Sequence, residues 1–200
     1  MDPDNAVDEL RRLDTSGLLA LFTTLETPTI AEIDGEYTAA LLAQPNLFAV
    51  ATGKVAVGNP LAPWLCKAFR PVDENSGRGY NTFSEFGRVR QRYPMRTLLA
   101  PSRYDGAPAY TLVYRAYTSL CGSIHMVDEV RRAAHGVYLG MGTWGFTDAQ
   151  RRVARPFLLT GPVSPYRGDI GVGRATFTPG PRELPGPLAC HPTPSERRTP

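Results

Sequence analysis

The clearest pattern of hydrophobic and polar positions lies in residues 103–144. Short runs of β-branched and aromatic residues alternate there with Gly and Pro, which is typical of strands and turns in a small all-β domain. Tyr110, Leu112 and Tyr114 share one face of such a strand, because successive side chains point to opposite sides. The other face carries a Thr, a Val and Arg115, so neither face is cleanly apolar. Two mixed faces favour a barrel with a lined interior.

The rest of the chain adds two helices and further strands to this picture. The apolar residues over 17–25 have the i, i+3, i+4, i+7 spacing of a helix, which Thr15 or Ser16 would cap: Leu18, Leu21, Phe22 and Leu25. Strands are expected over residues 30–42, 47–57, 64–69, 80–86 and 95–100. A capping box at 147–150 predicts a short helix over 148–154. The fold class is therefore mainly β: an antiparallel barrel over about residues 30–145 with short flanking N-terminal and C-terminal helices.

Composition and charge narrow the class of protein. With 42% hydrophobic and 20% charged residues, the 200-residue chain has enough apolar residues for the core of one domain. A net charge of +3 is too small to indicate nucleic-acid binding. The one cluster of basic residues is interpreted as a solvated turn, with an anionic ligand as the alternative: Arg88, Arg90, Arg92 and Arg96. No apolar run approaches the length of about 20 residues that would span a bilayer.

The two ends of the chain and the cysteines suggest where the protein works. The N-terminus lacks the basic and apolar regions of a secretory signal. Three widely spaced cysteines then favour free thiols in a reducing cytosol, and a cytoplasmic location is expected. Seven prolines fall between residue 179 and the end. We therefore expect an N-terminal segment over 1–15, a barrel domain over 16–178 and a Pro-rich disordered tail over 179–200.

Several separated pieces of the chain resemble one bacterial family. Gly-Glu-Tyr-Thr-Ala at 35–39 is similar to a Gly-x-Trp-x-Gly motif, and Trp-Leu-Cys-Lys-Ala-Phe at 64–69 to a Trp-x-Gly-Lys-x-Phe segment. Arg-Tyr-Asp-Gly at 103–106, followed by Thr-Leu-Val-Tyr at 111–114, is similar to a Tyr-x-Gly and Thr-Met-Val-Tyr hairpin. Asp-Glu-Val-Arg-Arg at 128–132 is similar to an Asp-His-Phe-Arg-Arg element. In this order, over about residues 16–145, the pieces resemble the bacterial GXWXG proteins.

The resemblance implies a lipocalin-like β-barrel, in a family with no established general activity. The chain differs from the family pattern at Tyr37 and Ala39, which replace Trp and Gly. Arg115 and Glu129 stand where the family usually has Asp and His. Those two differences remove a polar pair that would otherwise be a catalytic or ligand-binding candidate.

Aromatic residues and one lysine are the candidates for binding a ligand. Tyrosines offer apolar rings with polar tips, as ligand cavities use, although aromatic strand residues are commonly core. Lys67 aimed into a barrel would pair with a carboxylate or hold an anionic head group; otherwise its stem covers apolar surface. The candidate ligand-binding residues are Tyr37, Trp64, Lys67, Tyr110 and Tyr114.

Catalytic candidates are fewer and weaker. His125 with Asp128 or Glu129 would form a His–carboxylate pair for proton transfer. The alternative is a polar strand end in which Arg131 and Arg132 pair with these carboxylates, as an ordinary exposed ion-pair cluster. Cys121 and His125 on one strand would stand roughly 13 Å apart, too far for a nucleophile and its base.

Metal and cofactor sites find no support in the sequence. His125, His135 and His191 have no ligand-like spacing, and no Gly-rich loop has the strand–helix context of a phosphate-binding motif. Gly140 and Gly142 are typical of close packing or a barrel bend. We expect no metal and no cofactor.

Three functions stay open on this basis. The first is an intracellular barrel that binds a hydrophobic or amphipathic small molecule, with Lys67 or an arginine fixing its polar end. The second is an isomerase- or cyclase-type enzyme on the same barrel, in which His125 or a tyrosine transfers a proton. The third is a protein-interaction module that uses the Pro-rich tail. Nothing in the sequence indicates the oligomeric state.

Overall fold

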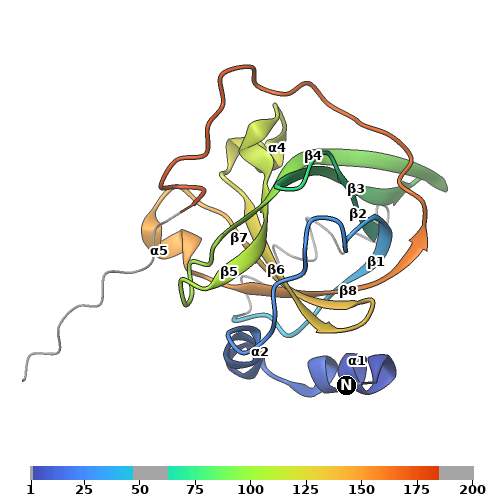
Figure 1. The fold of residues 1–200 in the computed structure, drawn as a ribbon, viewed down its shortest axis with the longest axis vertical. Coiled ribbons are helices and arrows are strands. Elements are labelled where there is room, and N and C mark those ends of the chain that lie inside the picture. The colour runs from blue at the N-terminus through green and yellow to red at the C-terminus, as the bar shows by residue number, and fades with distance from the viewer. Residues whose placement is uncertain (1, 47–62, 185–200) are drawn as a thin grey trace, which may run out of the picture.

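An eight-stranded antiparallel barrel forms the body of the protein. The computed structural model describes residues 2–46 and 63–184, and Figure 1 looks into the barrel. Each strand pairs with the next along the chain, and the last pairs with the first, which closes the barrel. The strands are β1 (Gly35–Leu41), β2 (Trp64–Pro71), β3 (Ser76–Glu85), β4 (Arg88–Pro101), β5 (Pro108–Val113), β6 (Val127–Ala134), β7 (Val137–Thr143) and β8 (Arg155–Ser164). The predicted fold class, a mainly β antiparallel barrel, is confirmed.

The closing strand lies beyond the limit near residue 145 that the sequence pattern suggested. In a closed barrel β1 needs a partner on each edge, and β8 supplies the second one. The short helix before β8, α5 (Asp148–Arg151), opens with the expected capping box between Thr147 and Gln150. The expected strand over 47–57 falls outside the described residues.

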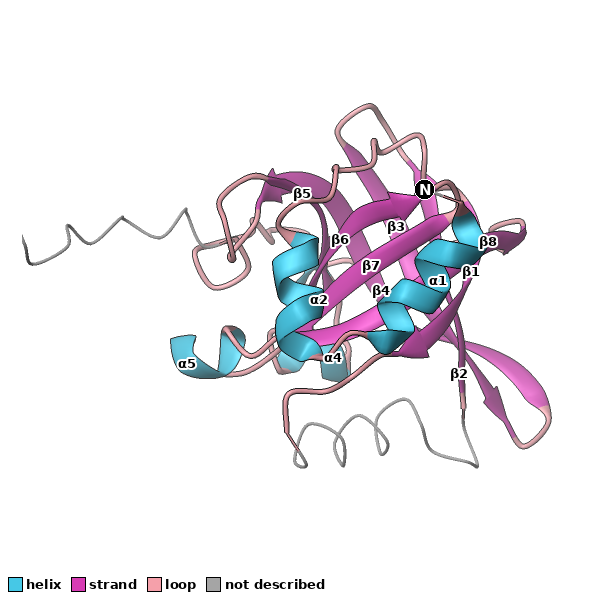
Figure 2. Cartoon of the chain, turned by 90° about the horizontal axis from the view of Figure 1, so that it is seen from below, coloured by secondary structure: helices cyan, strands magenta, loops and turns pink. Residues whose placement is uncertain are grey.

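Two N-terminal helices cover one wall of the barrel. Figure 2 shows α1 (Pro3–Arg12) and α2 (Thr15–Phe22) lying across the outer side of β6, β7 and β8. Asp14, rather than the expected Thr15 or Ser16, caps α2: its carboxylate accepts a hydrogen bond from Gly17 N at 2.7 Å. Leu18 and Phe22, on the predicted apolar stripe, are fully buried against the barrel. The helix therefore packs on a sheet, as its pattern indicated.

Aromatic side chains fill the half of the interior where β1, β5 and β7 begin. The rings of Tyr37 and Tyr110 each pack against Phe69, with centroids 5.9 and 5.8 Å apart. Ile30 and Ile33, from the segment before β1, are buried in the same cluster. This end of the barrel is therefore filled with side chains.

The outer face of β5 and β6 is mixed because buried ion pairs lie on it. Arg103 donates from Nε to Glu129 Oε1 at 3.1 Å, and both side chains are 3% exposed. Arg131 donates to both carboxylate oxygens of Asp105, at 2.7 and 2.8 Å. The expected pairing of Arg131 and Arg132 with Asp128 and Glu129 is thus wrong: the loop before β5 brings Asp105 to Arg131, and Arg132 pairs with Glu26 and Glu32.

The chain after β8 crosses the outside of the barrel and returns to it. Asp169 accepts hydrogen bonds from Arg70, and the long loop that follows arches over the barrel in Figure 1. Near its end Glu183, only 5% exposed, lies 3.0 Å from His125 Nδ1. Residues 179–184, which the sequence assigned to a disordered tail, are therefore packed on the barrel. Residues 185–200 lie outside the described part.

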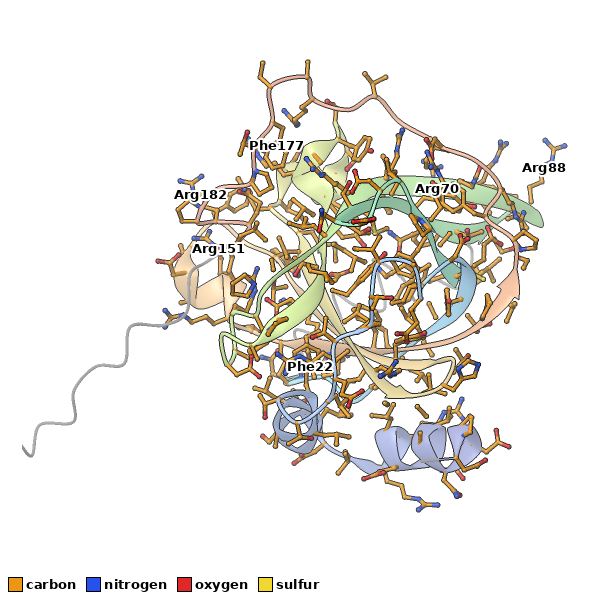
Figure 3. All side chains as sticks on the ribbon, viewed as in Figure 1. Phe22, Arg70, Arg88, Arg151, Phe177 and Arg182 are labelled. Carbon is orange, nitrogen blue, oxygen red and sulfur yellow. The ribbon has the colours of Figure 1, made fainter. Side chains whose placement is uncertain are left out.

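The cluster of arginines lies on a strand and not in a turn. Arg88, Arg90 and Arg92 are exposed on β4, in a hairpin with β3 that extends beyond the barrel wall. Figure 3 shows Arg88 at the tip of this hairpin, pointing away from the protein. Arg92 pairs with Glu85 on the facing strand. Extended pairing across the hairpin outweighs the repulsion among the exposed cations.

Candidate functional site

A cavity occupies the opposite end of the barrel interior, where β1 and β7 finish and β2, β6 and β8 begin. Its volume is about 380 Å³. Its wall is mainly apolar and aromatic, and includes Trp64, Phe83, Tyr93, Met126, Trp144 and Phe157. Both tryptophans of the chain thus face the same space. The cavity exists because side chains fill only the other half of the barrel.

Glycines on β7 shape this space. A Cβ at Gly140 would lie 2.1 Å from the Phe157 ring, so the ring occupies the place of a side chain. Gly142, one step further along the same face, lines the cavity directly. The sequence prediction that these two glycines permit close packing holds for Gly140.

A buried ion pair lies in the cavity wall. Lys67 Nζ is 2.7 Å from Asp128 Oδ2, and each side chain is 2% exposed. The ammonium also lies 5.0 Å from the centre of the Phe157 ring and 5.3 Å from those of Trp64 and Tyr114. Attraction to these rings adds to the ion pair in offsetting the cost of removing the charges from water.

The Tyr114 hydroxyl joins this pair to a wider network. It accepts hydrogen bonds from Lys67 Nζ at 2.6 Å and from Asn81 Nδ2 at 3.2 Å, and it donates to Asp128 Oδ2 at 2.9 Å. Those three bonds use the full capacity of a phenol hydroxyl. Trp64 Nε1 in turn donates to Asn81 Oδ1 at 3.1 Å. The network fixes the polar side of the cavity in one arrangement.

Burial determines the protonation of two groups beside the pair. It raises the pKa of Tyr114 well above its ordinary value, and the negative charge of Asp128 adds to that effect. Burial, with the same carboxylate as the second cause, raises the pKa of Cys121 to about 12. Both groups therefore keep their protons at neutral pH, so Cys121 is not poised as a thiolate nucleophile.

Three polar atoms of cavity-lining residues have unused hydrogen-bonding capacity. Within the described residues, the buried atoms Gln44 Oε1, Asp128 Oδ1 and Arg155 Nε have no hydrogen-bond partner. Gly142 is the register partner of Asp128 and Arg155, so it lies between them across β6, β7 and β8. An acceptor and a donor thus flank a position without a side chain.

The structure brings together four of the residues singled out in the sequence. Trp64, Lys67, Tyr114 and Asp128 all line the cavity. Lys67 pairs with a carboxylate, which was one of the two interpretations of its role.

The two remaining ligand-binding candidates, Tyr37 and Tyr110, are inside the barrel but pack in its filled half. Tyr37 Oη bonds to the Asp34 carbonyl at 3.3 Å, and Tyr110 Oη bonds to Thr97 Oγ1 at 3.0 Å. Neither lines the cavity. Their position is that of core residues.

The other catalytic candidates lie away from the cavity. Glu129 points to the outside, where it accepts hydrogen bonds from Arg103. His125 bonds to Glu183, a residue of the C-terminal segment, and not to Asp128 or Glu129. Its backbone φ of 53° turns the chain between α4 (Leu120–Ser123) and β6, which directs the ring away from the barrel interior. No proton-transfer pair forms between His125 and the β6 carboxylates.

Sequence reasoning missed Asn81, Gly142 as an open position, and Arg155. Asn81 faces Lys67 in the β2–β3 register, and Arg155 faces Gly142 in the β7–β8 register. Alternation within a strand indicates which residues share a face, but register between strands decides which ones meet. That register was not readable from the chain.

Among the described residues, no three His, Cys, Asp or Glu side chains come together in a way that could hold a metal ion. In the same part of the chain, no helix combines the length and apolar character needed to cross a bilayer.

Comparison with known proteins adds a structural likeness without a function. No family model matches the chain, and no curated protein matches it. A solved structure titled "Crystal structure of protein from Thermomonospora curvata" is similar, with 12% sequence identity and a TM-score of 0.49. The likeness covers 78% of this chain and 93% of that one. The chain is an eight-stranded antiparallel barrel with no family assignment.

Proposed function

We propose that this protein binds an apolar or amphipathic small molecule in the cavity of its barrel. The observation that carries the proposal is a cavity of about 380 Å³, which falls within the size range of small-molecule sites, with an aromatic wall and a few fixed polar groups. Burying ligand surface against this wall would supply the affinity, at about 25 cal/mol per Å² before the costs of binding. As part of this proposal, we infer that the protein is a lipocalin-like barrel related to the GXWXG proteins.

The polar network favours a rigid site over an adaptable one. Lys67, Tyr114 and Asp128 hold one another through bonds of 2.6 to 2.9 Å, so their positions do not depend on a ligand. Preorganised polar groups lower the entropic cost of binding, because fewer side chains must be ordered when the ligand enters.

A neutral fluorescent probe tests the proposal. N-phenyl-1-naphthylamine brightens in apolar surroundings and accepts energy from tryptophan. We expect it to bind, to brighten, and to quench the emission of Trp64 and Trp144, because both line the cavity. No binding to the folded wild-type protein would overturn the proposal.

A matched pair of variants locates the probe. Cys121→Phe places a ring inside the cavity and should weaken probe binding by about tenfold or more, because overlapping atoms cannot share the space. Cys66→Phe makes the same change at a residue that does not line the cavity and should bind the probe as wild type does. Circular dichroism confirms that each variant is folded. Equal affinity in the two variants would place the probe outside the cavity.

A second candidate is an enzyme that transfers a proton inside the barrel. The observation that favours it is the Tyr114 phenol, a buried proton donor, next to Asp128, whose Oδ1 has no partner among the described residues. The sequence offered His125 or a tyrosine for this proton transfer, and in this proposal Tyr114 takes that role with Asp128 beside it. Asp128→Asn would then abolish turnover of a bound substrate, and a lack of any chemical change in compounds that co-purify with the protein would count against the enzyme.

A further inference from the structure

Three charged side chains line the described part of the cavity wall: Lys67, Asp128 and Arg155. Lys67 and Asp128 form an ion pair and cancel each other's charge. Arg155 has no carboxylate within ion-pair distance in the described residues, and the sequence of residues 47–62 contains no Asp or Glu. The described wall of the cavity therefore carries one positive charge without compensation.

The surroundings of Arg155 leave its guanidinium available to a ligand. The group stacks on the Trp144 ring, with 4.7 Å between Cζ and the ring centre. Its Nη1 donates to the Val153 carbonyl at 3.4 Å, while its buried Nε donates to no described residue. Stacking on an aromatic ring holds the planar fork in one orientation but leaves N–H groups at its edge free.

Gly142 separates Arg155 from Asp128 on the inner wall of the barrel. It pairs in register with Arg155 on one side and with Asp128 on the other, so these three residues form a row across the inner wall. A Cβ at Gly142 would lie 3.1 Å from Asp128 Oδ1. A side chain at Gly142 would therefore crowd the Asp128 carboxylate, and an anionic head is expected on the Arg155 side of the row, away from Asp128 Oδ1.

We propose that the ligand is an amphipathic anion whose carboxylate head pairs with Arg155, while its apolar tail lies against the aromatic wall of the cavity. This inference rests on the proposed binding function and adds the charge of the ligand to it. A guanidinium fork matches a carboxylate with two parallel hydrogen bonds, which a lysine ammonium does not provide. Lys67 is in any case already bonded to Asp128 and Tyr114.

The electrostatic cost of an isolated cation supports this choice. Burial lowers the pKa of the Arg155 guanidinium from its ordinary value, which means that the surroundings disfavour the charge. A carboxylate delivered by a ligand would relieve that cost, whereas a neutral head would leave it in place and a cationic head would increase it.

Three probes with the same tail test the charge of the ligand: decanoate, decanol and decylamine. Each is titrated below its micellar concentration against protein loaded with N-phenyl-1-naphthylamine, and its inhibition constant is measured. We expect the inhibition constant of decanoate to be about tenfold lower than that of decanol, a difference of about 1.4 kcal/mol in binding free energy. Decylamine should be the weakest of the three.

Two arginine variants test whether Arg155 causes the preference for decanoate over decanol. The measured quantity is the ratio of the decanoate and decanol constants, so any change in affinity for the fluorescent probe cancels. Arg155→Met should bring this ratio close to one. Arg152→Met removes an exposed charge three residues earlier, outside the cavity wall, and should keep the wild-type ratio.

The outcomes separate this inference from the function on which it rests. Probe binding with equal displacement by decanoate and decanol would overturn the inference alone. A preference for decanoate that survives in Arg155→Met would overturn it as well. Failure of wild-type protein to bind the neutral probe would overturn the proposed function itself.

Discussion

Removing one member of the Lys67–Asp128 pair should cost far more than removing both. Lys67→Met keeps most of the side-chain bulk but leaves a carboxylate that is 2% exposed without its cation. Breaking a buried pair from one side typically costs about 3–5 kcal/mol, because the remaining charge stays buried and uncompensated. At roughly 2–4 °C per kcal/mol for a chain of this length, the melting temperature should fall by roughly 6–20 °C. Asp128→Asn should have a similar cost, since it leaves the ammonium in the same position.

The double variant, Lys67→Met with Asp128→Asn, buries no charge. It loses the hydrogen bond from the ammonium to the Tyr114 hydroxyl, but the amide that replaces the carboxylate needs no cation beside it. The double variant should therefore be about 1–3 kcal/mol less stable than the wild type. The double variant is thus expected to be more stable than either single variant. The coupling energy in the double-mutant cycle should be at least about 3 kcal/mol.

Urea unfolding at 25 °C measures the free energy of unfolding of each protein in the cycle. Unfolding is followed by far-ultraviolet circular dichroism, since tryptophan emission would also respond to changes in the cavity. The matched control is the exposed pair Arg70–Asp169, with side chains 36% and 29% exposed, where Arg70→Met should cost about 1 kcal/mol or less. Additive costs at Lys67 and Asp128, or a single-variant cost near that of the control, would refute the reasoning. The ammonium would then be reaching water rather than lying in the barrel wall.

Three other side chains have contacts or reactivity that can be measured: Cys121, Glu183 and Arg131. Cys121 should react slowly with iodoacetamide in the folded protein at pH 8, because the thiolate is the nucleophile and burial raises the pKa of this thiol to about 12. The reaction should become faster only as the pH approaches that value. Rapid alkylation at pH 8 would contradict the burial of Cys121. Glu183→Ala should lower the free energy of unfolding by about 1–3 kcal/mol, because it leaves the buried His125 ring without its partner; an unchanged urea midpoint would show that the segment does not dock. Arg131→Met should cost about 3–5 kcal/mol in the same assay, since the guanidinium is 1% exposed and its carboxylate partner would lose its cation; a cost below about 1 kcal/mol would count against this packing.

The fold was readable from the chain because its signals are local. Alternation at Tyr110, Leu112 and Tyr114 placed these three residues on one face, and the structure buries all three inside the barrel. The capping box at Thr147 likewise predicted where α5 begins. Alternation and capping depend on neighbours within a few residues, so the sequence displays them directly.

The contacts across the barrel were not readable in this way. His125 and Asp128 are three residues apart, yet His125 bonds to Glu183, which is 58 residues away. His125 has a positive φ in the turn before β6, and a non-glycine residue gives little warning of that conformation. Sequence proximity therefore suggested a proton-transfer pair where the backbone separates the two groups.

Position along the barrel axis explains why only some of the inward tyrosines reach the cavity. Tyr110 and Tyr114 both belong to the buried interior cluster, but Tyr110 lies among the residues that fill one end, next to Phe69. Ile30 and Ile33 reach that end from the segment before β1, which the sequence assigned to a strand over 30–42 but which the structure leaves outside β1. The depth of the cavity is thus set by a connecting segment, and Tyr114 lines it because it directly follows β5, beyond the filled region. In a closed barrel, alternation decides which side chains point inward, whereas the segments that fill one end decide which of those side chains can meet a ligand.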